Sequence, residues 1–296
     1  MANLTVSVII PVFNGAEDLR GAIESALQQV GCCPEVVVVN DGSTDSTGEI
    51  MDSYGDRIRA IHQKNLGAAG LARTRNHGVA ASSGDWVAFL DHDDLWEPDK
   101  LSRQLALAEA RNADIVYSNA RNFGDTDRVA DLRSDPALML EGDLFQPLLM
   151  DNFIVMSSAV IKRSLFDSIG RFTEDPVVAE DWDLWLKAAA AGARFAAVRE
   201  PVTSYRWRPG SFSKNHERMR QLRLLAVQRA LETDRGRLLP WSIRRRALAN
   251  VESCSAWFLA STSPRSAIPC YARSLSLWPF DLNSWKGMLK GCLGRS

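Results

Sequence analysis

Cysteine and histidine are scarce in this chain of 296 residues, which holds five cysteines and four histidines. A small, odd number of scattered cysteines excludes a disulfide framework. Cys32 and Cys33 are adjacent, and adjacent cysteines do not have the spacing of a zinc site. Free thiols persist in a reducing compartment, so we expect a cytoplasmic location, with a peripheral position on the inner face of the membrane as an alternative.

Long apolar runs are missing as well, and no run approaches the roughly 20 residues that a membrane-spanning helix needs. The first apolar stretch, from Val6 to Val12, contains Pro11 and follows a segment without Lys or Arg, unlike a secretory signal peptide. The composition, 46% hydrophobic and 24% charged, is that of an ordinary globular protein with ample material for a core.

Acidic residues are rare in the last part of the chain. From Arg235 onward, ten cations stand against Glu252 and Asp281, so this segment carries about +8 and the remainder about −9. Four tryptophans lie among these cations. Two interpretations stay open: a basic segment in peripheral contact with an anionic membrane, or a helical appendage that packs its Trp and Leu side chains inward. With a net charge of −1, we expect no nucleic-acid partner.

The first third of the chain alternates apolar, β-branched runs with segments of helical periodicity. We expect strands at residues 6–10, 35–39, 58–62, 86–90 and 115–117, and helices at 17–29, 46–54, 70–82, 101–110 and 181–191. Such alternation predicts βαβ units and a largely parallel sheet with helices on both faces. Asp45 is the expected N-cap of the second helix. Residues 121–140 are expected to be an irregular loop, and the chain from about residue 215 to be helical.

One apolar run ends abruptly in carboxylates: Asp91, Asp93 and Asp94 follow Trp86–Leu90. Carboxylates at the end of a buried strand are costly unless a cation meets them, and a divalent metal carrying a phosphorylated ligand would do so. A polar turn, with Asp94 or Asp99 as the N-cap of the next helix, is the alternative. If the strand continues, Asp91 and Asp93 share one face about 6.5 Å apart, His92 faces the other side, and one ion cannot easily take both carboxylates.

Two further polar clusters follow earlier strands, namely Phe13-Asn14-Gly15 and Asn40-Asp41-Gly42-Ser43. Such residues are common in ordinary turns, so each cluster alone says little. In open parallel sheets, however, ligands bind beyond the carboxyl ends of the strands. Three clusters at one predicted edge therefore favour a pocket, and its acidic character calls for a ligand that brings a metal, a sugar or a base edge.

Four blocks of the sequence resemble family 2 glycosyltransferases of the GT-A fold, in the order that this family shows. They are residues 7–18 (SVIIPVFNGAED), 38–49 (VVNDGSTDSTGE), 65–101 (NLGAAG through DHDDLWEPDKL) and 180–186 (EDWDLWL). The resemblance implies an α/β fold: a single Rossmann-like domain over residues 1–214, with a mostly parallel central sheet flanked by helices. A C-terminal helical extension would occupy residues 215–296.

The same resemblance implies an inverting transfer of a sugar from a nucleotide-diphosphate sugar, with UDP as the first expectation, to an acceptor hydroxyl. The acceptor would be a glycan or a lipid-linked sugar, and the product a polysaccharide, lipopolysaccharide or other cell-surface glycan. A nucleotide-sugar-binding module without catalysis is the main alternative. A nucleotidyltransferase would need a Gly-rich basic loop after the first strand, whereas Phe13 to Asp18 is acidic.

Carried over residue by residue, the resemblance assigns the donor contacts. Asp41 would hydrogen-bond the base, and Arg73 would contact the nucleotide, although Arg75 is two residues away and is the alternative. The residues that line the base would be Pro11, Val12 and Asn14.

The resemblance also assigns the reacting groups. Asp91 would face the ribose, Asp93 would bind Mn²⁺ or Mg²⁺, and Asp181 would be the general base. The chemistry agrees, because a diphosphate leaving group needs a bridging cation and an inverting displacement needs a base on the acceptor side. Glu180 and Asp181 also lie where a helix begins, so stabilising the helix dipole is their alternative role.

One position departs from the family pattern. Many relatives carry a His shortly after a Tyr-Arg pair, whereas here Arg208 follows Tyr205, Arg206 and Trp207. A guanidinium has no lone pair for a metal, but it can neutralise a diphosphate directly. The need for metal is therefore less firmly predicted than the Asp-x-Asp motif alone suggests.

Overall fold

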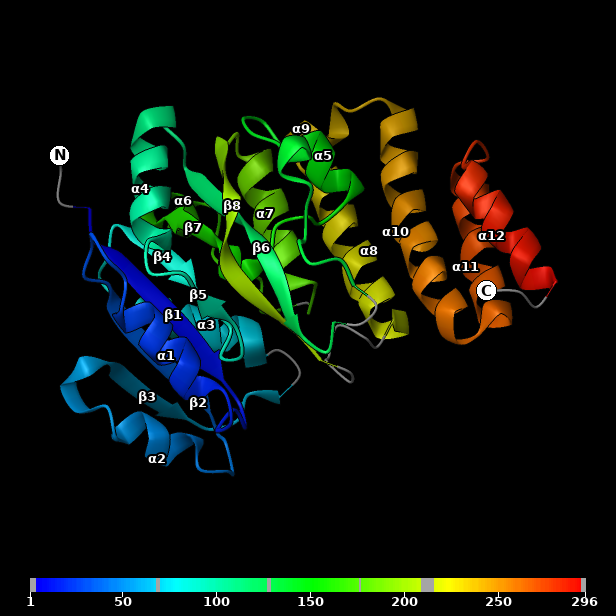
Figure 1. Ribbon diagram of the computed structural model, residues 1–296. Helices are drawn as coiled ribbons and strands as arrows, with labels where there is room; N and C mark the ends of the chain where they lie inside the picture. The colour runs from blue at the N-terminus through cyan, green and yellow to red at the C-terminus, as the bar shows by residue number, and fades with distance from the viewer. Residues whose placement is uncertain (1–3, 68–69, 127–128, 176, 209–215, 294–296) are drawn as a thin grey trace. The chain divides into compact units, whose positions relative to one another are not determined.

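The computed structural model describes residues 4–67, 70–126, 129–175, 177–208 and 216–293 (Figure 1). The chain divides into two compact units. The first contains Met1–Leu144, Phe153–Pro176 and Ala191–Arg208, and the second contains Phe145–Asn152, Val177–Ala190 and Pro209–Ser296. The expected domain boundary at residue 214 stays a prediction, and the compact units differ from it by grouping two segments from the middle of the chain with the C-terminal helices.

The first unit is built on an eight-stranded sheet in the order β3-β2-β1-β4-β7-β6-β8-β5. Its strands are β1 (Val6–Val12), β2 (Glu35–Asp41), β3 (Arg59–Gln63), β4 (Trp86–Phe89), β5 (Leu95–Trp96), β6 (Ile115–Gly124), β7 (Ala159–Lys162) and β8 (Phe195–Trp207). Only β7 and β5 run against the other six strands. The expected mostly parallel α/β sheet is therefore confirmed.

Helices cover both faces of this sheet, as expected. One face packs on α1 (Leu19–Leu27), α2 (Thr47–Asp52) and α4 (Lys100–Arg111), and the other carries α3 (Gly70–Ala80) and α6 (Arg163–Ser168). Successive strand residues alternate between the two layers: Val8 and Ile10 join the first, and Ile9 faces α3. At Gly78 a Cβ atom would lie 2.5 Å from Ile9 Cγ2, so this close approach of helix and sheet requires glycine.

Short 3₁₀ helices connect several of these elements: η1 (Gly55–Arg57), η3 (Pro136–Leu138) and η4 (Met156–Ser158). The sequence did not predict η4, β5, β7, α6 or β8. These elements are short or, in β8, interrupted by Pro201 where the pairing with β6 shifts register near Asn119. Such pairings depend on distant partners and leave little local periodicity.

Two local expectations hold only in part. Residues 121–140 do not form a loop throughout, because β6 continues to Gly124 alongside β8. The second helix begins at Thr47 with Ser46 in the N-cap position; the Asp45 carboxylate lies one residue earlier and accepts a hydrogen bond from the Thr47 N–H at 3.1 Å.

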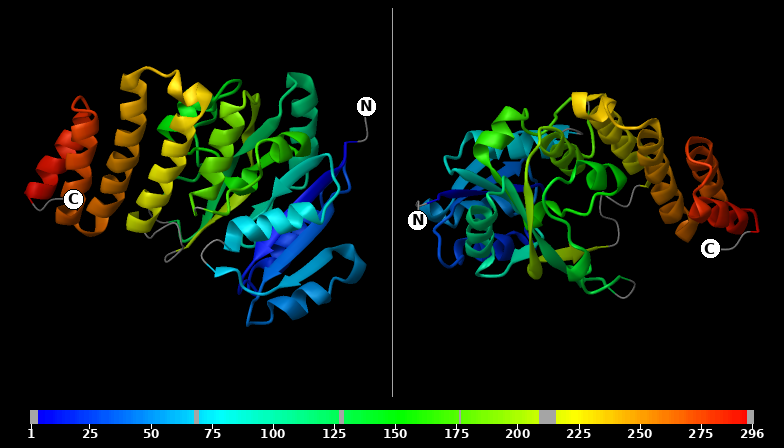
Figure 2. Two further views of the ribbon diagram at one scale, coloured as in Figure 1. Left: turned by 180° about the vertical axis from the view of Figure 1, so that it is seen from behind. Right: turned by 90° about the horizontal axis from the view of Figure 1, so that it is seen from above.

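The second unit is helical. It contains α5 (Phe145–Met150), α7 (Glu180–Ala190), α8 (His216–Glu232), α9 (Asp234–Arg237), α10 (Trp241–Thr262), α11 (Pro264–Leu277) and α12 (Leu282–Cys292). Figure 2 shows α8, α10 and α11 as successive neighbours, from yellow to red. Trp182 and Trp185 of α7 are buried, so core packing explains this pair. Within the described residues, no helix is both long and apolar enough to span a bilayer.

Candidate functional site

The parallel strands β2, β1 and β4 are neighbours and end at the same edge of the sheet, here called the carboxyl edge. Pro11 and Val12 are the last residues of β1 and pair with Val39 and Asn40 of β2. The chain adds β2 and β3 on one side of β1 and β4 on the other, so the strand order reverses here. Such a reversal leaves a crevice that commonly binds ligands in α/β proteins.

Asn14 joins the first two turns at the carboxyl edge. Its backbone has φ of 50°, a left-handed conformation that asparagine tolerates better than most residues. Its N–H donates to Ser43 Oγ at 2.9 Å, and its side-chain Oδ1 accepts from the Thr44 N–H at 2.8 Å. The turns after β1 and β2 are therefore held as one rigid piece.

Asp41 is the buried carboxylate of the second turn, with 7% of the residue exposed. Its Oδ1 accepts hydrogen bonds from Gln63 Nε2 at 2.9 Å and from the Leu66 N–H at 3.1 Å. Its Oδ2 lies against the start of α3, since a Cβ at Gly70 would come within 2.6 Å of that oxygen. These contacts hold the Asp41 carboxylate in one orientation, which a group that hydrogen-bonds a nucleotide base would need.

The two arginines of α3 differ in their surroundings. Arg73 is 44% exposed in its side chain and pairs with Glu174 at 3.5 Å. The Arg75 side chain is only 2% exposed; its Nη2 lies 2.6 Å from Asp91 Oδ1, and its guanidinium stacks over the Phe172 ring. The structure therefore brings Arg75, and not Arg73, to the carboxylates that follow β4.

The strand ends before the carboxylates, so the expectation that Asp91 and Asp93 share one face of a continuing strand was wrong. β4 ends at Phe89, and the Asp94 N–H donates to the Asp91 carbonyl at 3.0 Å, which closes a turn. Beyond Phe89 the backbone has no neighbouring strand to pair with, so it forms a turn with its own internal hydrogen bond. His92 consequently lies against Gly15 instead of on the opposite face of a strand.

Asp94 anchors this turn and is not a helix cap. It is 1% exposed, and its carboxylate accepts from Ser157 Oγ at 2.6 Å and from the Arg206 N–H at 2.8 Å. Burial and the nearby carboxylates of Asp91 and Asp93 raise the pKa of Asp94 well above its usual range. Burial and the Asp91 carboxylate also raise the pKa of Asp93. The charged forms of Asp93 and Asp94 are therefore disfavoured at this turn unless a cation meets them.

Two arginines at the end of β8 reach the same edge. Arg206 donates from Nε to the Asp93 carbonyl at 2.9 Å and pairs through Nη2 with Asp18 Oδ1 at 3.1 Å. Arg208 pairs with the other oxygen of Asp18 and lies 3.9 Å from Glu17. No role was predicted for Arg206 or Asp18; only the Tyr-Arg pair and the acidic end of the first block pointed to them.

Asp181 belongs to the second unit, in the first turn of α7. Its Oδ2 accepts from Asn152 Nδ2 at 2.9 Å, and its Oδ1 accepts from the Trp182 N–H at 2.6 Å. Asp183, two residues later, is 2% exposed and pairs with Arg229 at 3.1 Å and Lys187 at 3.5 Å. Of these two acids, Asp183 is held by salt bridges and Asp181 by neutral donors, so their surroundings suit different tasks.

Within the described part of the chain, no cluster of three or more His, Cys, Asp or Glu side chains could hold a metal. The carboxyl edge nevertheless fits Mn²⁺ or Mg²⁺ in its donor chemistry. Mg²⁺ in proteins often takes only one or two carboxylates, with phosphate and water oxygens completing its shell. Asp93 beside Asp91 is such a donor set, and it suits an ion that arrives together with a diphosphate.

These features define an α/β fold whose polar residues gather at the carboxyl edge of the sheet. The family model for glycosyl transferase family 2 matches residues 7–170, and the chain belongs to this family.

Curated relatives agree with that assignment. An uncharacterised glycosyltransferase of Rickettsia typhi is 35% identical over 186 residues, which are 62% of this chain and 58% of the relative. The succinoglycan biosynthesis protein ExoO of Rhizobium meliloti is 33% identical over 220 residues, 71% of this chain and 62% of ExoO. The chain therefore spans about three fifths of the length of these two relatives.

Solved structures show the same GT-A fold at low sequence identity. TarS of S. aureus in complex with UDP superposes with a TM-score of 0.68 at 18% identity, covering 97% of this chain and 89% of that one. The mannosyltransferase PcManGT from Pyrobaculum calidifontis, in complex with GDP-Man and Mn²⁺, gives a TM-score of 0.59 at 18% identity, covering 98% and 85%.

Proposed function

We propose that this chain is an inverting glycosyltransferase that moves a sugar from a UDP-linked donor to a hydroxyl of a glycan or lipid-linked acceptor. The observation that carries the proposal is the carboxyl edge, where three adjacent parallel strands end. Asn14 follows β1, Asp41 ends β2, and Asp91 and Asp93 follow β4. Family membership supports sugar transfer, and the UDP bound to TarS supports the choice of nucleotide. The name of ExoO supports a role in polysaccharide synthesis. A position in the cytoplasm, or peripherally on the inner face of the membrane, is part of this proposal.

The donor would lie along the carboxyl edge. Pro11, Val12 and Asn14 line the base, and Asp41, whose direction is fixed by Gln63 and Leu66, hydrogen-bonds it. Asp91 contacts the ribose and is held in place by Arg75, which we assign in preference to Arg73 as the arginine of this site. Asp93 binds the Mn²⁺ or Mg²⁺ that neutralises charge on the leaving diphosphate.

Asp181 would be the general base that takes the proton from the acceptor hydroxyl. A base must be held in one orientation within reach of the proton it removes. The Asn152 amide and the Trp182 N–H hold the Asp181 carboxylate in this way and leave it as an acceptor. Arg208, paired with Asp18, would face the donor phosphates from the end of β8.

Thermal unfolding with a panel of nucleotide sugars, with and without Mn²⁺, tests the donor site. We expect UDP-linked donors to raise the melting temperature only when the metal is present, and Asp93→Asn to lose this metal-dependent rise. Asp56→Asn, an exposed acid in η1, is the matched control and should behave as the wild type. Stabilisation by every nucleotide without metal, or an unchanged response in Asp93→Asn, contradicts the assignment. Donor binding without transfer to any acceptor would favour the non-catalytic alternative.

A further inference from the structure

Helix α12 turns its large apolar side chains outward. Leu282, Leu289 and Leu293 are 70%, 64% and 61% exposed, and Trp285 is 48% exposed. The spacings of three, four and four residues place all four on one side of the helix, here called the outer stripe. An ordinary surface helix buries such a stripe, so α12 is inverted.

The inward side of α12 is made of small residues. Ser284 and Gly291 are buried, and a Cβ at Gly287 would collide with the Tyr271 ring of α11. Small residues allow close packing of α12 on its neighbours, and they fix which side faces inward. The exposure of the outer stripe therefore results from specific packing within the second unit.

The apolar surface extends past the start of the helix. Phe280 is 74% exposed, and its ring contacts Trp278 at 5.3 Å between centroids. Trp278 in turn meets Trp241, which is 65% exposed, at 6.4 Å. A connected, exposed apolar surface of this kind usually marks an interaction site.

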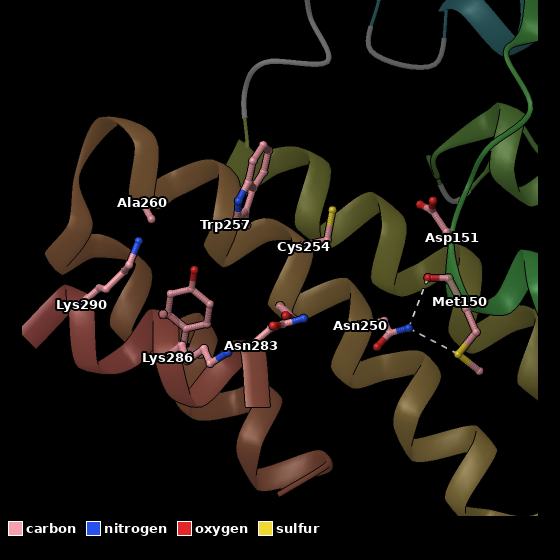
Figure 3. Close-up of a pocket in the computed structure, with 12 residues that line it drawn as sticks. Met150, Asp151, Asn250, Cys254, Trp257, Ala260, Asn283, Lys286 and Lys290 are labelled. Atoms are coloured by element: carbon pink, nitrogen blue, oxygen red, sulfur yellow. Dashed lines mark hydrogen bonds between the residues drawn. The ribbon is translucent and has the colours of Figure 1, made fainter. Parts of the chain in front are cut away.

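The charge along α12 is positive. Lys286 and Lys290 are exposed, and residues 282–292 contain no acid. The Asp281 carboxylate before the helix is occupied as its cap, accepting from the Asn283 N–H at 3.0 Å and from Ser284 Oγ at 2.6 Å. Figure 3 shows Lys286 and Lys290 along a cavity of about 770 Å³ that Trp257 of α10 also lines. Both lysines thus lie on one flank of the outer stripe.

Four arginines earlier in this basic segment contact acids or backbone carbonyls within the second unit. Arg235 donates to the Ala189 carbonyl at 2.8 Å, and Arg245 donates to the Leu277 carbonyl at 2.6 Å. Arg244 lies 3.6 Å from Glu232, and Arg273 lies 3.0 Å from the buried Glu252. The excess positive charge of this segment is therefore not one uniform surface, and α12 combines exposed apolar and cationic residues.

We infer that the outer stripe docks on the surface of an anionic phospholipid bilayer, with its leucines among the upper acyl chains and Lys286 and Lys290 at the level of the phosphates. A helix of 11 residues is about 16 Å long, and it cannot cross a hydrocarbon core of about 30 Å. It can lie in the plane of the interface, where leucine, tryptophan and lysine are favoured. This inference rests on the proposed function, since it names the membrane as partner of an enzyme with a lipid-linked acceptor.

Vesicle co-sedimentation of the full chain tests the inference without any donor or acceptor. We expect binding to phosphatidylcholine vesicles that contain phosphatidylglycerol, and weak binding to phosphatidylcholine alone. Leu282→Asn combined with Leu289→Asn should lower the partition coefficient at least about tenfold. Lys286→Gln combined with Lys290→Gln should remove most of the preference for the anionic vesicles.

Leu138→Asn combined with Leu140→Asn is the matched control, because both side chains are exposed and lie in the first unit. This control should bind vesicles as the wild type does. Equal binding of the wild type and the outer-stripe variant overturns the inference. So does a wild type that is dimeric in vesicle-free buffer while the outer-stripe variant is monomeric, because the stripe is then a contact between two copies.

Donor-dependent thermal shifts on the same preparations separate this inference from the proposed function. An outer-stripe variant that loses vesicle binding should keep its response to UDP-linked donors and Mn²⁺. A wild type that binds vesicles but no nucleotide sugar would contradict the proposed function. The inference that the outer stripe binds an anionic bilayer would then still hold.

Discussion

In the first unit, arginines near the carboxyl edge hold carboxylates, as Arg75 holds Asp91 and Arg208 holds Asp18. In the second unit, arginines hold both buried acids and backbone carbonyls, as Arg273 holds Glu252 and Arg235 holds the Ala189 carbonyl. The distinguishing feature of this unit is the acid-free helix α12, which presents leucines to solvent. Paired charges at a strand edge fix the positions of groups that could recognise a small polar ligand. Exposed apolar side chains on a rigidly packed helix suit a broad surface. The two units therefore indicate two different kinds of partner.

The largest effect should come from Asp181→Asn. This change keeps the shape of the side chain and removes its ability to take a proton, so turnover should fall by about 10² to 10⁴. Donor-induced thermal stabilisation should persist, because the donor contacts lie in the first unit. Asp183→Asn is the comparison: it should mainly destabilise α7, since it weakens salt bridges to Arg229 and Lys187. Unchanged turnover in Asp181→Asn would refute the base assignment.

Next in size is the contrast between Arg75→Met and Arg73→Met. Removing the buried partner of Asp91 should lower the unfolding free energy by about 3 kcal/mol, and donor affinity should fall with it. The exposed Arg73–Glu174 pair should contribute less than about 1 kcal/mol. Denaturant titrations of both variants measure this difference. Similar losses in the two variants would mean that burial does not distinguish these arginines.

A smaller effect concerns Lys100, a lysine whose side chain is buried in the first unit. Its Nζ donates to Gln104 Oε1 at 2.7 Å and lies over the Trp96 ring, and burial lowers the pKa of Lys100 well below its usual range. Between that lowered pKa and the ordinary lysine value, the unfolded chain binds one more proton than the folded chain. Wild-type stability should therefore rise with pH in this window, and be lost as pH falls.

Lys100→Met lacks this titrating group. The difference in unfolding free energy, variant minus wild type, should therefore decrease as the pH is raised from neutral towards 10. Chemical denaturation at several pH values gives both curves. Parallel curves would show that Lys100 keeps its proton in the folded chain.

The smallest effect should be on the stability of the outer-stripe variant in plain buffer. Exposed surface substitutions usually change the unfolding free energy by no more than about 0.5 kcal/mol. Leu282→Asn with Leu289→Asn should therefore unfold nearly as the wild type does by calorimetry, although it loses vesicle binding. A large destabilisation would show that these leucines contribute to packing within the second unit.

Local sequence pattern was enough to predict β1 to β4, the helices between them and the carboxyl edge. Val6 to Ile10 and Trp86 to Leu90 are apolar runs closed by turn residues, and such runs can be assigned as buried strands from the local sequence alone. Features that depend on contacts with residues far along the chain could not be predicted from local sequence. The turn at Asp91–Asp94 depends on Ser157 and Arg206, which lie far along the chain. Periodicity alone also cannot distinguish the exposed Arg73 from the buried Arg75.

The sequence also could not predict that α12 exposes its large apolar side chains and buries its small ones. Its residues repeat with helical periodicity, but periodicity does not say which side of a helix faces the rest of the protein. That choice is made by Ser284, Gly287 and Gly291, whose small size matters only against neighbours such as Tyr271. The sequence predicted the basic segment as a whole, whereas the position of each cation within it, such as Lys286 and Lys290 on the exposed side of α12, follows only from the structure.

The Asp18 carboxylate forms ion pairs with two arginines at once. One carboxylate, 7% exposed in its side chain, receives Arg206 on one oxygen and Arg208 on the other, and so ties the end of β8 to the segment before α1. Loss of either arginine leaves the other in place, whereas loss of both leaves a buried charge without a counterion. The losses of unfolding free energy in the two single variants should therefore sum to less than the loss in the double variant. Each arginine can then compensate for the absence of the other.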